Sequence, residues 1–513
     1  MSASSALVLR NPGSAPLGDL DVLAADEFRS RVIEEVAAGA RISALFGLEP
    51  WQRTRGAQPV ALVAVIARDA PGELALYATE VQGAYDSLTP ALSQAHRFER
   101  EIAEQWNVRP EGHPWLKPVR FALPHRVAAG GVPAEVPVIG HVDYFRVEGA
   151  EIHEVAVGPV HAGVIEPGHF RFQCHGETVY HLEISLGYQH RGIERALEGG
   201  PDRRTLHLVE TMAGDSSVAH ALAYCLLAES LADAASPPRA DSLRALVLEL
   251  ERLANHVGDL GALAGDVGYL PASAFCGRIR GDALNMTALV CGNRFGRSML
   301  RPGGVVFDVD PGQSAELRRR LDGLLRDARS ACDLLWKTPA LVARFEGTGT
   351  VSRELAAEIG LVGPAARASG LARDVRADFP AGWYARSRPS ACLGAGGDVL
   401  ARARVRWLEV ESSVGLVRGV LEELDRPGSA GPVGETSGSL RPRRIAAALT
   451  EGWRGEVCHV AVTDRQGRLG RYKVVDPSFH NWFGLACAMR GQQISDFPLC
   501  NKSFNLSYCG HDL

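Results

Sequence analysis

The chain has 513 residues, of which 46% are hydrophobic, and a net charge of -5. Such a composition is ordinary for a globular protein with room for two or three domains and a sizeable core. The weakly acidic balance gives no electrostatic basis for binding nucleic acid. No apolar run approaches the roughly eighteen residues that span a bilayer, and the N-terminus lacks the features of a signal peptide. We therefore expect a cytoplasmic chain with reduced thiols and no transmembrane segment of its own.

Residues 1–125 predict a small α/β module. Residues 21–38 have helical periodicity, and a short apolar segment at 40–48 is followed by a strand-like run at 59–68. A helix is expected around 91–106, and the Pro and Gly residues at 108–114 end it. A stretch rich in Gly and Pro follows, so residues 126–139 are interpreted as a linker to a second domain at 140–513.

The second domain is predicted to be mostly helical with a small antiparallel sheet. Residues 140–182 alternate apolar and polar side chains, which favours the sheet. Helical patterns dominate 190–425, and 243–263 is the clearest of them. Residues 425–442 are typical of a loop, 445–451 predict a helix, 457–463 and 469–475 predict a strand pair, and the tail is expected to be irregular. The fold class expected for the whole chain is therefore α+β.

The ten cysteines are widely spaced, and the closest pair is nine residues apart. Zinc ribbons, iron–sulfur loops and redox dithiols need two thiolates presented by one short loop. That spacing is missing here, so most of the cysteines are expected to be small buried hydrophobic residues. Phosphate-loop, zincin and serine-hydrolase motifs are also missing from the sequence.

Three stretches concentrate polar residues where a core pattern would not place them. They are GPVHAGVIEPGHFRF at 158–172, ETMAGDSSVAH at 210–220 and CNKSFNLSYCGHDL at 500–513. Taken singly, each is more typical of a turn, a helix cap or a tail than of a site. In particular, Asp215, Ser216 and Ser217 are natural N-cap residues for the apolar helix that follows them.

Four further segments occur in a fixed order along the chain. They are EISLGYQHRGIE at 183–194, LELERLANH at 248–256, RPGG at 301–304 and GPAARASG at 363–370. Together they resemble the large subunits of group 4 membrane-bound [NiFe] hydrogenases, of the formate hydrogenlyase type. That family also includes the 49-kDa protein of respiratory complex I. Upstream, SLTP at 87–90, HRFERE at 96–101 and GHP at 112–114 resemble the complex I 30-kDa module that formate hydrogenlyase-type proteins carry in front.

The resemblance implies a nickel–iron centre held by four thiolates, but this chain departs from the pattern at all four positions. Matching the Ala-His pair that ends at His220 places Ala213 and Ser216 at the first two thiolate positions. Matching the C-terminal loop places Ser507 and Gly510 at the second two. Because Ser and Gly offer no soft thiolate donor, we expect no metal at these positions and no active hydrogenase.

The complex I side of the family implies a quinone site made of a histidine on a β-turn and a tyrosine. His161 or His169 could supply the histidine, whereas Thr211 stands where the tyrosine would be. The resemblance therefore implies no cofactor bound by this chain alone, leaves a quinone at its interface open, and places an iron–sulfur cluster in a partner subunit.

The pocket of the family is expected to persist here with a polar lining. The candidate lining residues are His161, His169, Glu210, Asp215, Ser216, His220 and Ser507. Ionisable groups in a cleft suit proton transfer or quinone contact; the alternative is a collapsed pocket whose groups satisfy one another.

Two functions follow from these interpretations. The first is a non-metal large subunit that couples electron or proton transfer between an iron–sulfur small subunit and membrane antiporter-like subunits, at the inner face of the plasma membrane. The second is a structural scaffold with no redox activity.

Overall fold

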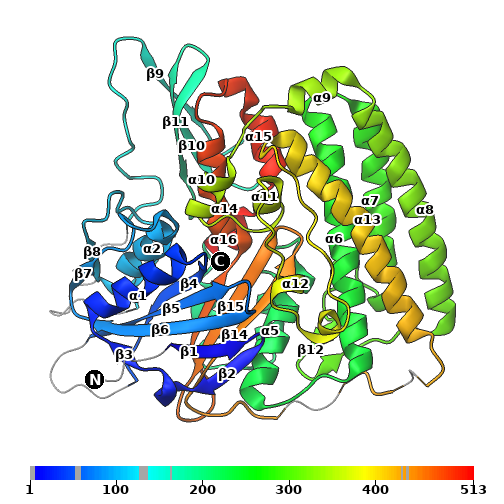
Figure 1. Ribbon diagram of the computed structural model, residues 1–513, viewed down its shortest axis with the longest axis horizontal. Coiled ribbons are helices and arrows are strands. Elements are labelled where there is room, and N and C mark those ends of the chain that lie inside the picture. Colours follow the sequence, from blue (N-terminus) through cyan, green and yellow to red (C-terminus); the bar gives the residue numbers. More distant parts are fainter. Residues whose placement is uncertain (1–5, 52–58, 126–136, 162–164, 429–430, 435–437) are drawn as a thin grey trace.

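The computed structural model describes residues 6–51, 59–125, 137–161, 165–428, 431–434 and 438–513. The N-terminal part forms a sheet in the order β1 (Leu7–Arg10), β6 (Glu73–Val81), β5 (Val60–Arg68) and β4 (Arg41–Leu48), with the short β3 (Val22–Leu23) parallel to β6. Helices α1 (Ala25–Ala37) and α2 (His96–Trp106) pack beside it (Figure 1). The helices and strands predicted for this part are confirmed.

A second small sheet lies at the top of Figure 1. It consists of β9 (Ile152–Val157), β10 (His169–His175) and β11 (Thr178–Ser185), paired antiparallel with β10 in the middle. This is the antiparallel sheet expected from the alternating pattern. The predicted linker at 126–139 lies mostly outside the described residues.

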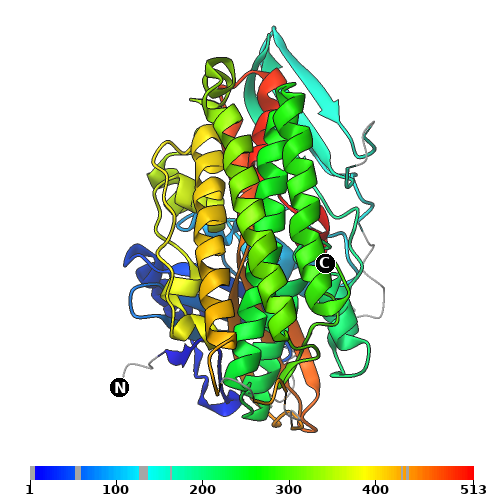
Figure 2. The same ribbon diagram turned by 90° about the vertical axis from the view of Figure 1, so that its right-hand side faces the viewer.

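Long helices dominate the middle of the chain, as predicted. Figure 2 shows that α6 (Pro238–Asp266), α7 (Leu270–Cys291), α8 (Pro311–Trp336) and α13 (Val399–Leu424) run along one another, and they form a bundle in which α6 and α8 each contact both α7 and α13. The shorter elements of this part of the chain are α3 (Ile193–Leu197), α4 (Thr205–Glu210), α5 (Ser217–Ala232), β12 (Leu300–Arg301), β13 (Gly304–Val305), α9 (Pro339–Phe345), α10 (Arg353–Glu358), α11 (Gly363–Ala368), α12 (Val375–Asp378) and η3 (Gly382–Ala385).

The prediction of a helix at 445–451 was wrong, because this segment is the strand β14 (Arg444–Gly452). It pairs with β15 (Gly455–Thr463), which pairs with β16 (Leu469–Val475), and its other edge binds β2 (Gly13–Pro16) from the N-terminal part. Alternate residues of β14 enter two different hydrophobic cores. A strand buried on both faces has no polar alternation, so its alanine-rich sequence could not be told from a helix.

The expectation of an irregular tail was also wrong. The described residues after β16 form α14 (Pro477–Ala488), α15 (Phe497–Phe504) and α16 (Tyr508–Asp512). Asp476 caps the first of these, and Pro477 stands at its first position, which is a recognisable start signal. The C-terminus lies in the middle of the molecule (Figure 1), and Leu513 is fully buried.

The N-terminal and C-terminal parts share a core. Residues of β4, β5 and β6 pack in one cluster with one face of β14 and β15, whereas the other face joins the helical core. The position of the domain boundary stays a prediction. None of the described helices combines the length and hydrophobicity that a bilayer crossing needs.

Candidate functional site

Two loops far apart in the sequence meet where the candidate site was expected. The first runs from Thr211 to Ser216, between α4 and α5, and the second is the C-terminal segment around α16. Arg191 joins them, because its guanidinium donates to the carbonyl oxygens of Thr211 at 2.7 Å, Met212 at 2.9 Å and Cys509 at 3.5 Å. The structure therefore brings together the two segments that the resemblance paired.

Arg454, from the turn between β14 and β15, is the central cation of this site. It donates two hydrogen bonds to the carboxylate of Asp215, at 2.5 and 2.8 Å, and one to the backbone oxygen of Asn505 at 2.5 Å. Its guanidinium also stacks 3.9 Å from the ring centroid of Trp453. Burial alone would lower the pKa of Arg454, but Asp215 outweighs burial and raises that pKa. Arg454 thus joins the two loops, through a planar ion pair with Asp215 and a hydrogen bond to the backbone of Asn505.

The four positions assigned to thiolates are occupied by groups with other roles. Ala213 is a buried methyl group, and Ser216 Oγ lies 3.4 Å from Arg454 Nη1. Ser507 caps α16, accepting from the Gly510 amide at 2.9 Å. A Cβ added at Gly510 would lie 2.7 Å from Asp476 Oδ2. These residues do not fit a thiolate-held nickel–iron centre, because they supply no sulfur and a guanidinium stands beside them.

The prediction that most cysteines are buried is confirmed, since eight of the ten are buried and two are half-buried. Cys509 is the one nearest to a former ligand position, with its Sγ 3.4 Å from Ser507 Oγ. Burial, together with Glu166, raises the pKa of its thiol to about 11, so the thiol stays protonated. Within the described residues, no group of three or more His, Cys, Asp or Glu side chains is placed to hold a metal ion.

Behind the loops, a buried hydrogen-bonded chain runs inward from Asp476. His220 Nε2 lies 3.0 Å from Asp476 Oδ2, His220 Nδ1 lies 3.1 Å from His459 Nε2, and His459 Nδ1 lies 2.8 Å from the Tyr472 hydroxyl. Burial raises the pKa of Tyr472 and lowers that of His459. With Tyr472 as first donor and the Asp476 carboxylate as last acceptor, one set of tautomers satisfies every link.

Of the two candidate histidines, His161 lies on the loop between β9 and β10, and His169 is the first residue of β10. His161 Nε2 is 3.0 Å from the Gly168 oxygen, and His169 Nδ1 is 3.1 Å from the Gly158 oxygen, so each binds the backbone of this loop. Glu166 of this loop reaches the C-terminal segment, where its carboxylate accepts from the Tyr508 amide at 3.2 Å. The loop therefore faces the site through Glu166.

Glu210 does not join the other candidates. Its carboxylate accepts from the Ser298 amide at 2.6 Å and lies 3.8 Å from His207, and burial raises its pKa. Ser216 is the N-cap residue of α5, as expected, but without a side-chain cap bond. Glu251 of α6 caps this helix instead, accepting from Val218 at 2.7 Å and from Ala219 at 3.2 Å.

Sequence reasoning missed most of the residues that hold the site together. They are Glu166, Arg191, Glu251, Arg454, His459, Tyr472, Asp476 and Asn505. Arg191 and Glu251 lie inside the segments that carry the family resemblance, so those segments were the available signal. Arg454 lies in a Gly-Trp-Arg-Gly turn, which would have marked a hairpin had 445–451 been interpreted as a strand.

Comparison with known proteins agrees with this geometry. Residues 266–437 match the family model described as the respiratory-chain NADH dehydrogenase 49 Kd subunit. The chain is 35% identical over 355 residues to the carbon monoxide-induced hydrogenase of Rhodospirillum rubrum, covering 69% of this chain and 97% of that protein. It is 30% identical to formate hydrogenlyase subunit 5 of Escherichia coli, covering 83% of this chain and 76% of that protein.

Relatives from complex I are similar to the same degree. NADH-quinone oxidoreductase subunit 4 of Thermus thermophilus is 30% identical, over 71% of this chain and 94% of that protein. The fold also matches a chain of the archaeal membrane-bound sulfane sulfur reductase, with a TM-score of 0.66 and 23% identity, over 71% of this chain and 99% of that chain. This protein therefore belongs to the family that unites the large subunits of group 4 [NiFe] hydrogenases with the 49-kDa subunit of complex I.

Proposed function

We propose that this chain is the large subunit of a membrane-associated redox complex of the hydrogenase and NADH-quinone oxidoreductase kind, and that it carries no nickel–iron centre. The observation that supports this most strongly is the position of Arg454: it pairs with Asp215 in one of the two loops that would present the thiolates, and it donates to the Asn505 oxygen at the start of the other. A buried guanidinium beside Ser216 and Asn505 repels a metal cation.

In this proposal the chain docks an iron–sulfur small subunit and membrane antiporter-like subunits, at the inner face of the plasma membrane. It couples electron or proton transfer across their junction. The side chain of Asp215 is about a third exposed (36%), so this carboxylate meets the medium at the site while Arg454 holds it from inside. Ionisable groups arranged in this way suit proton exchange with an adjoining redox partner, or contact with a quinone head group, better than hydride chemistry.

A scaffold without redox activity is the second candidate, and one observation favours it. Asp215, Arg454 and Asn505 satisfy one another's hydrogen bonds, as they would in a pocket that has closed. Such a chain would keep the fold for assembly alone.

Metal analysis of the complex purified through this chain tests the main proposal. We expect nickel below one tenth of an equivalent, and iron only in the amount that a copurified iron–sulfur subunit accounts for. One equivalent of nickel per chain would overturn the proposal. Purification without any iron–sulfur partner from native membranes would overturn the docking role.

The variants Asp215→Asn and Arg454→Lys separate the two candidates. Dye-linked electron transfer by the assembled complex is expected to fall at least tenfold in both, with assembly on native gels unchanged. Asp322→Asn, which weakens an exposed ion pair with Arg418, serves as the control and leaves the activity unchanged. Full activity in the two site variants would favour the scaffold.

A further inference from the structure

A second cluster of charged side chains lies deeper in the molecule, between α6, α11, α12, α13 and β14. All of its members are at most 4% exposed. They are the carboxylates Glu249, Asp374, Glu409 and Glu451, the guanidiniums Arg252, Arg367 and Arg376, and the imidazole of His256. Four carboxylates against three guanidiniums leave one negative charge in excess, and a buried net charge is costly in a medium of low dielectric constant.

The charged groups next to the cluster do not supply the missing positive charge, because each has an acid of its own. Arg406 donates to Asp259 at 2.7 Å, and Arg244 donates to Glu229 at 2.5 Å. Arg373 lies 3.4 Å from Asp69, which also pairs with Arg41, but Arg41 has Glu456 as a further acid, so these four charges cancel. The charge balance therefore calls for one bound proton within the cluster.

The hydrogen bonds show in which carboxylate the ionised form is stabilised least. Glu249 accepts from two arginines and two hydroxyl groups. Asp374 accepts from both ends of the Arg376 guanidinium, and Glu409 accepts from Arg367 and is 2.8 Å from His256 Nε2.

Glu451 has fewer close contacts with guanidinium groups than the other three carboxylates. It accepts one guanidinium hydrogen bond, from Arg367 Nη1 at 2.8 Å, and one amide hydrogen bond, from Val375 at 3.0 Å. Burial, with a contribution from Asp374, raises the pKa of Glu451 to about 7 despite the opposing effect of Arg367. Burial lowers the pKa of His256, so the imidazole competes poorly for the same proton.

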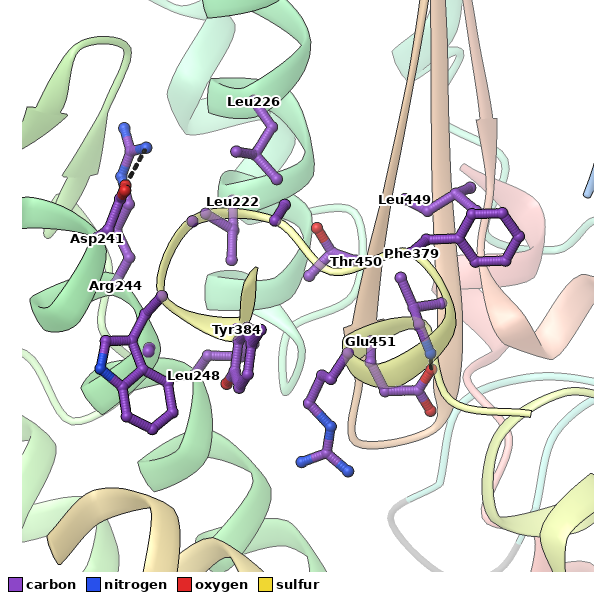
Figure 3. A pocket seen from close by; sticks show the side chains of 16 residues that line it. Leu222, Leu226, Asp241, Arg244, Leu248, Phe379, Tyr384, Leu449, Thr450 and Glu451 are labelled. Atoms are coloured by element: carbon purple, nitrogen blue, oxygen red, sulfur yellow. Dashed lines mark hydrogen bonds and ion pairs between the residues drawn. The ribbon is translucent and has the colours of Figure 1, made fainter. Parts of the chain in front are cut away.

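Glu451 also lines a cavity of about 30 Å³, whose other walls are mostly apolar. Figure 3 shows Glu451 and Asp241 on opposite sides of the lining, with Leu222 and Tyr384 between them. Asp241 is half-buried, so its end of the cavity lies nearest the surface. The Thr450 hydroxyl also lines the cavity and finds no partner within the described residues. A cavity of this size holds one or two waters, which would satisfy that hydroxyl.

We propose that Glu451 is a proton-binding site of this protein: the cluster holds one exchangeable proton on this carboxylate, and water in the cavity beginning at Asp241 delivers it. A cavity water gives a proton to the carboxylate, where an O–H bond forms, and takes another proton from the medium at the Asp241 end, so the water is regenerated and the cluster becomes neutral. The site is separate from the Arg454–Asp215 pair, although both adjoin the same hairpin: Arg252 donates to the backbone oxygens of Glu451 at 2.6 Å and of Gly452 at 3.0 Å, and Gly452 lies two residues before Arg454. Proton binding at Glu451 does not depend on the proposed function.

Proton titration of the full chain, as wild type and as Glu451→Gln, tests the site. Glutamine is neutral at every pH, so the variant is expected to take up one proton fewer than the wild type between pH 8.5 and 5.5. A difference curve centred near pH 4.5 would show an ordinary ionised glutamate and overturn the proposal, as would no difference at all. Near-UV circular dichroism at pH 5, where both forms are uncharged, checks the fold.

Two further variants keep the proposal testable if Glu451→Gln fails to fold. The first is the double variant Glu251→Gln/Asp378→Asn, which lacks two other carboxyls with raised pKa. In this variant we expect the infrared band of protonated Glu451 at pH 6 and its loss by pH 8.5. A missing band would overturn the site. Thr450→Val removes the hydroxyl that holds cavity water, so proton uptake after a pH jump is expected to slow several-fold; an unchanged rate would overturn the cavity route.

Discussion

Asp476 lies directly against Gly510: a Cβ at Gly510 would come within 2.7 Å of Asp476 Oδ2 and 2.9 Å of Ser507 Oγ. Asp476 cannot withdraw freely, since it binds His220 and caps α14. We therefore expect Gly510→Ala to lower the free energy of unfolding by about 1–3 kcal/mol, as overpacking of a buried position does. Urea denaturation followed by circular dichroism measures the change.

Gly214→Ala is the matched control for this substitution. Gly214 lies in the facing loop, and a Cβ there would meet no other atom within 4 Å. We expect the free energy of unfolding of the Gly214→Ala variant to stay within about 0.5 kcal/mol of that of the wild type. Equal effects at the two glycines would mean that Asp476 does not block position 510, and Gly510→Cys could then restore a ligand.

The Arg454–Asp215 ion pair is expected to stabilise the folded protein. Asp215→Ala leaves a largely buried guanidinium without its acid, which costs several kcal/mol when both partners are fully buried. Because the Asp215 side chain is 36% exposed, we expect a smaller loss of about 1–3 kcal/mol. Denaturation of Asp322→Ala gives the comparison, since that residue pairs with Arg418 at the surface. A loss no larger than in the surface variant would refute a structural role for the pair.

The sequence predicts some segments of this structure well and others poorly. The four family motifs and the periodicity at 243–263 were enough for the α+β class, for α6 and for the pairing of the two loops. They succeed because a long amphipathic helix and a strand with turn signals carry their structure locally. The segment 445–451 failed, because burial on both faces removes the period of two that marks a strand.

The side chains that organise the site could not be predicted in the same way. Arg454 and Asp215 are 239 residues apart, and the sequence around either residue does not indicate that the other is its partner. Glu251 was part of a quoted motif, yet its role in capping α5 depends on how α6 packs against that helix. Glu210 belongs to a stretch that was predicted to line the pocket, but its carboxylate accepts a hydrogen bond from the Ser298 amide instead. Residue type and loop position predicted the neighbourhood, whereas tertiary packing decided the partners.

The buried carboxyl of Glu251 is expected to make the stability of the protein depend on pH. Burial raises its pKa to about 8 in the folded chain, although the Val218 and Ala219 amides oppose this effect. The folded state therefore binds a proton that the unfolded state has already lost above a pKa of about 4.3. The stability due to this group is present at low pH and is lost as the pH rises from about 4.5 to 8, at up to about 1.4 kcal/mol per pH unit.

Glu251→Gln removes this dependence, because glutamine does not titrate. Unfolding free energies measured at several pH values from 5 to 8.5 are expected to fall less steeply with pH in the variant than in the wild type. Glu411→Gln, at a half-buried position of α13, controls for the loss of one carboxylate elsewhere. Parallel slopes in the wild type and Glu251→Gln would contradict the raised pKa.

The buried chain from Tyr472 to Asp476 makes the last prediction. Tyr472→Phe removes the donor to His459 Nδ1 and leaves a fully buried ring nitrogen without a partner, which costs about 1–3 kcal/mol of stability. Tyr224→Phe is the matched control, because the described part of the chain offers its hydroxyl no hydrogen-bond partner, and we expect it to be nearly neutral. If Tyr472→Phe also proved neutral, the bond between Tyr472 and His459 would contribute nothing to stability, and the role assigned to Tyr472 as the first donor of this chain would be contradicted.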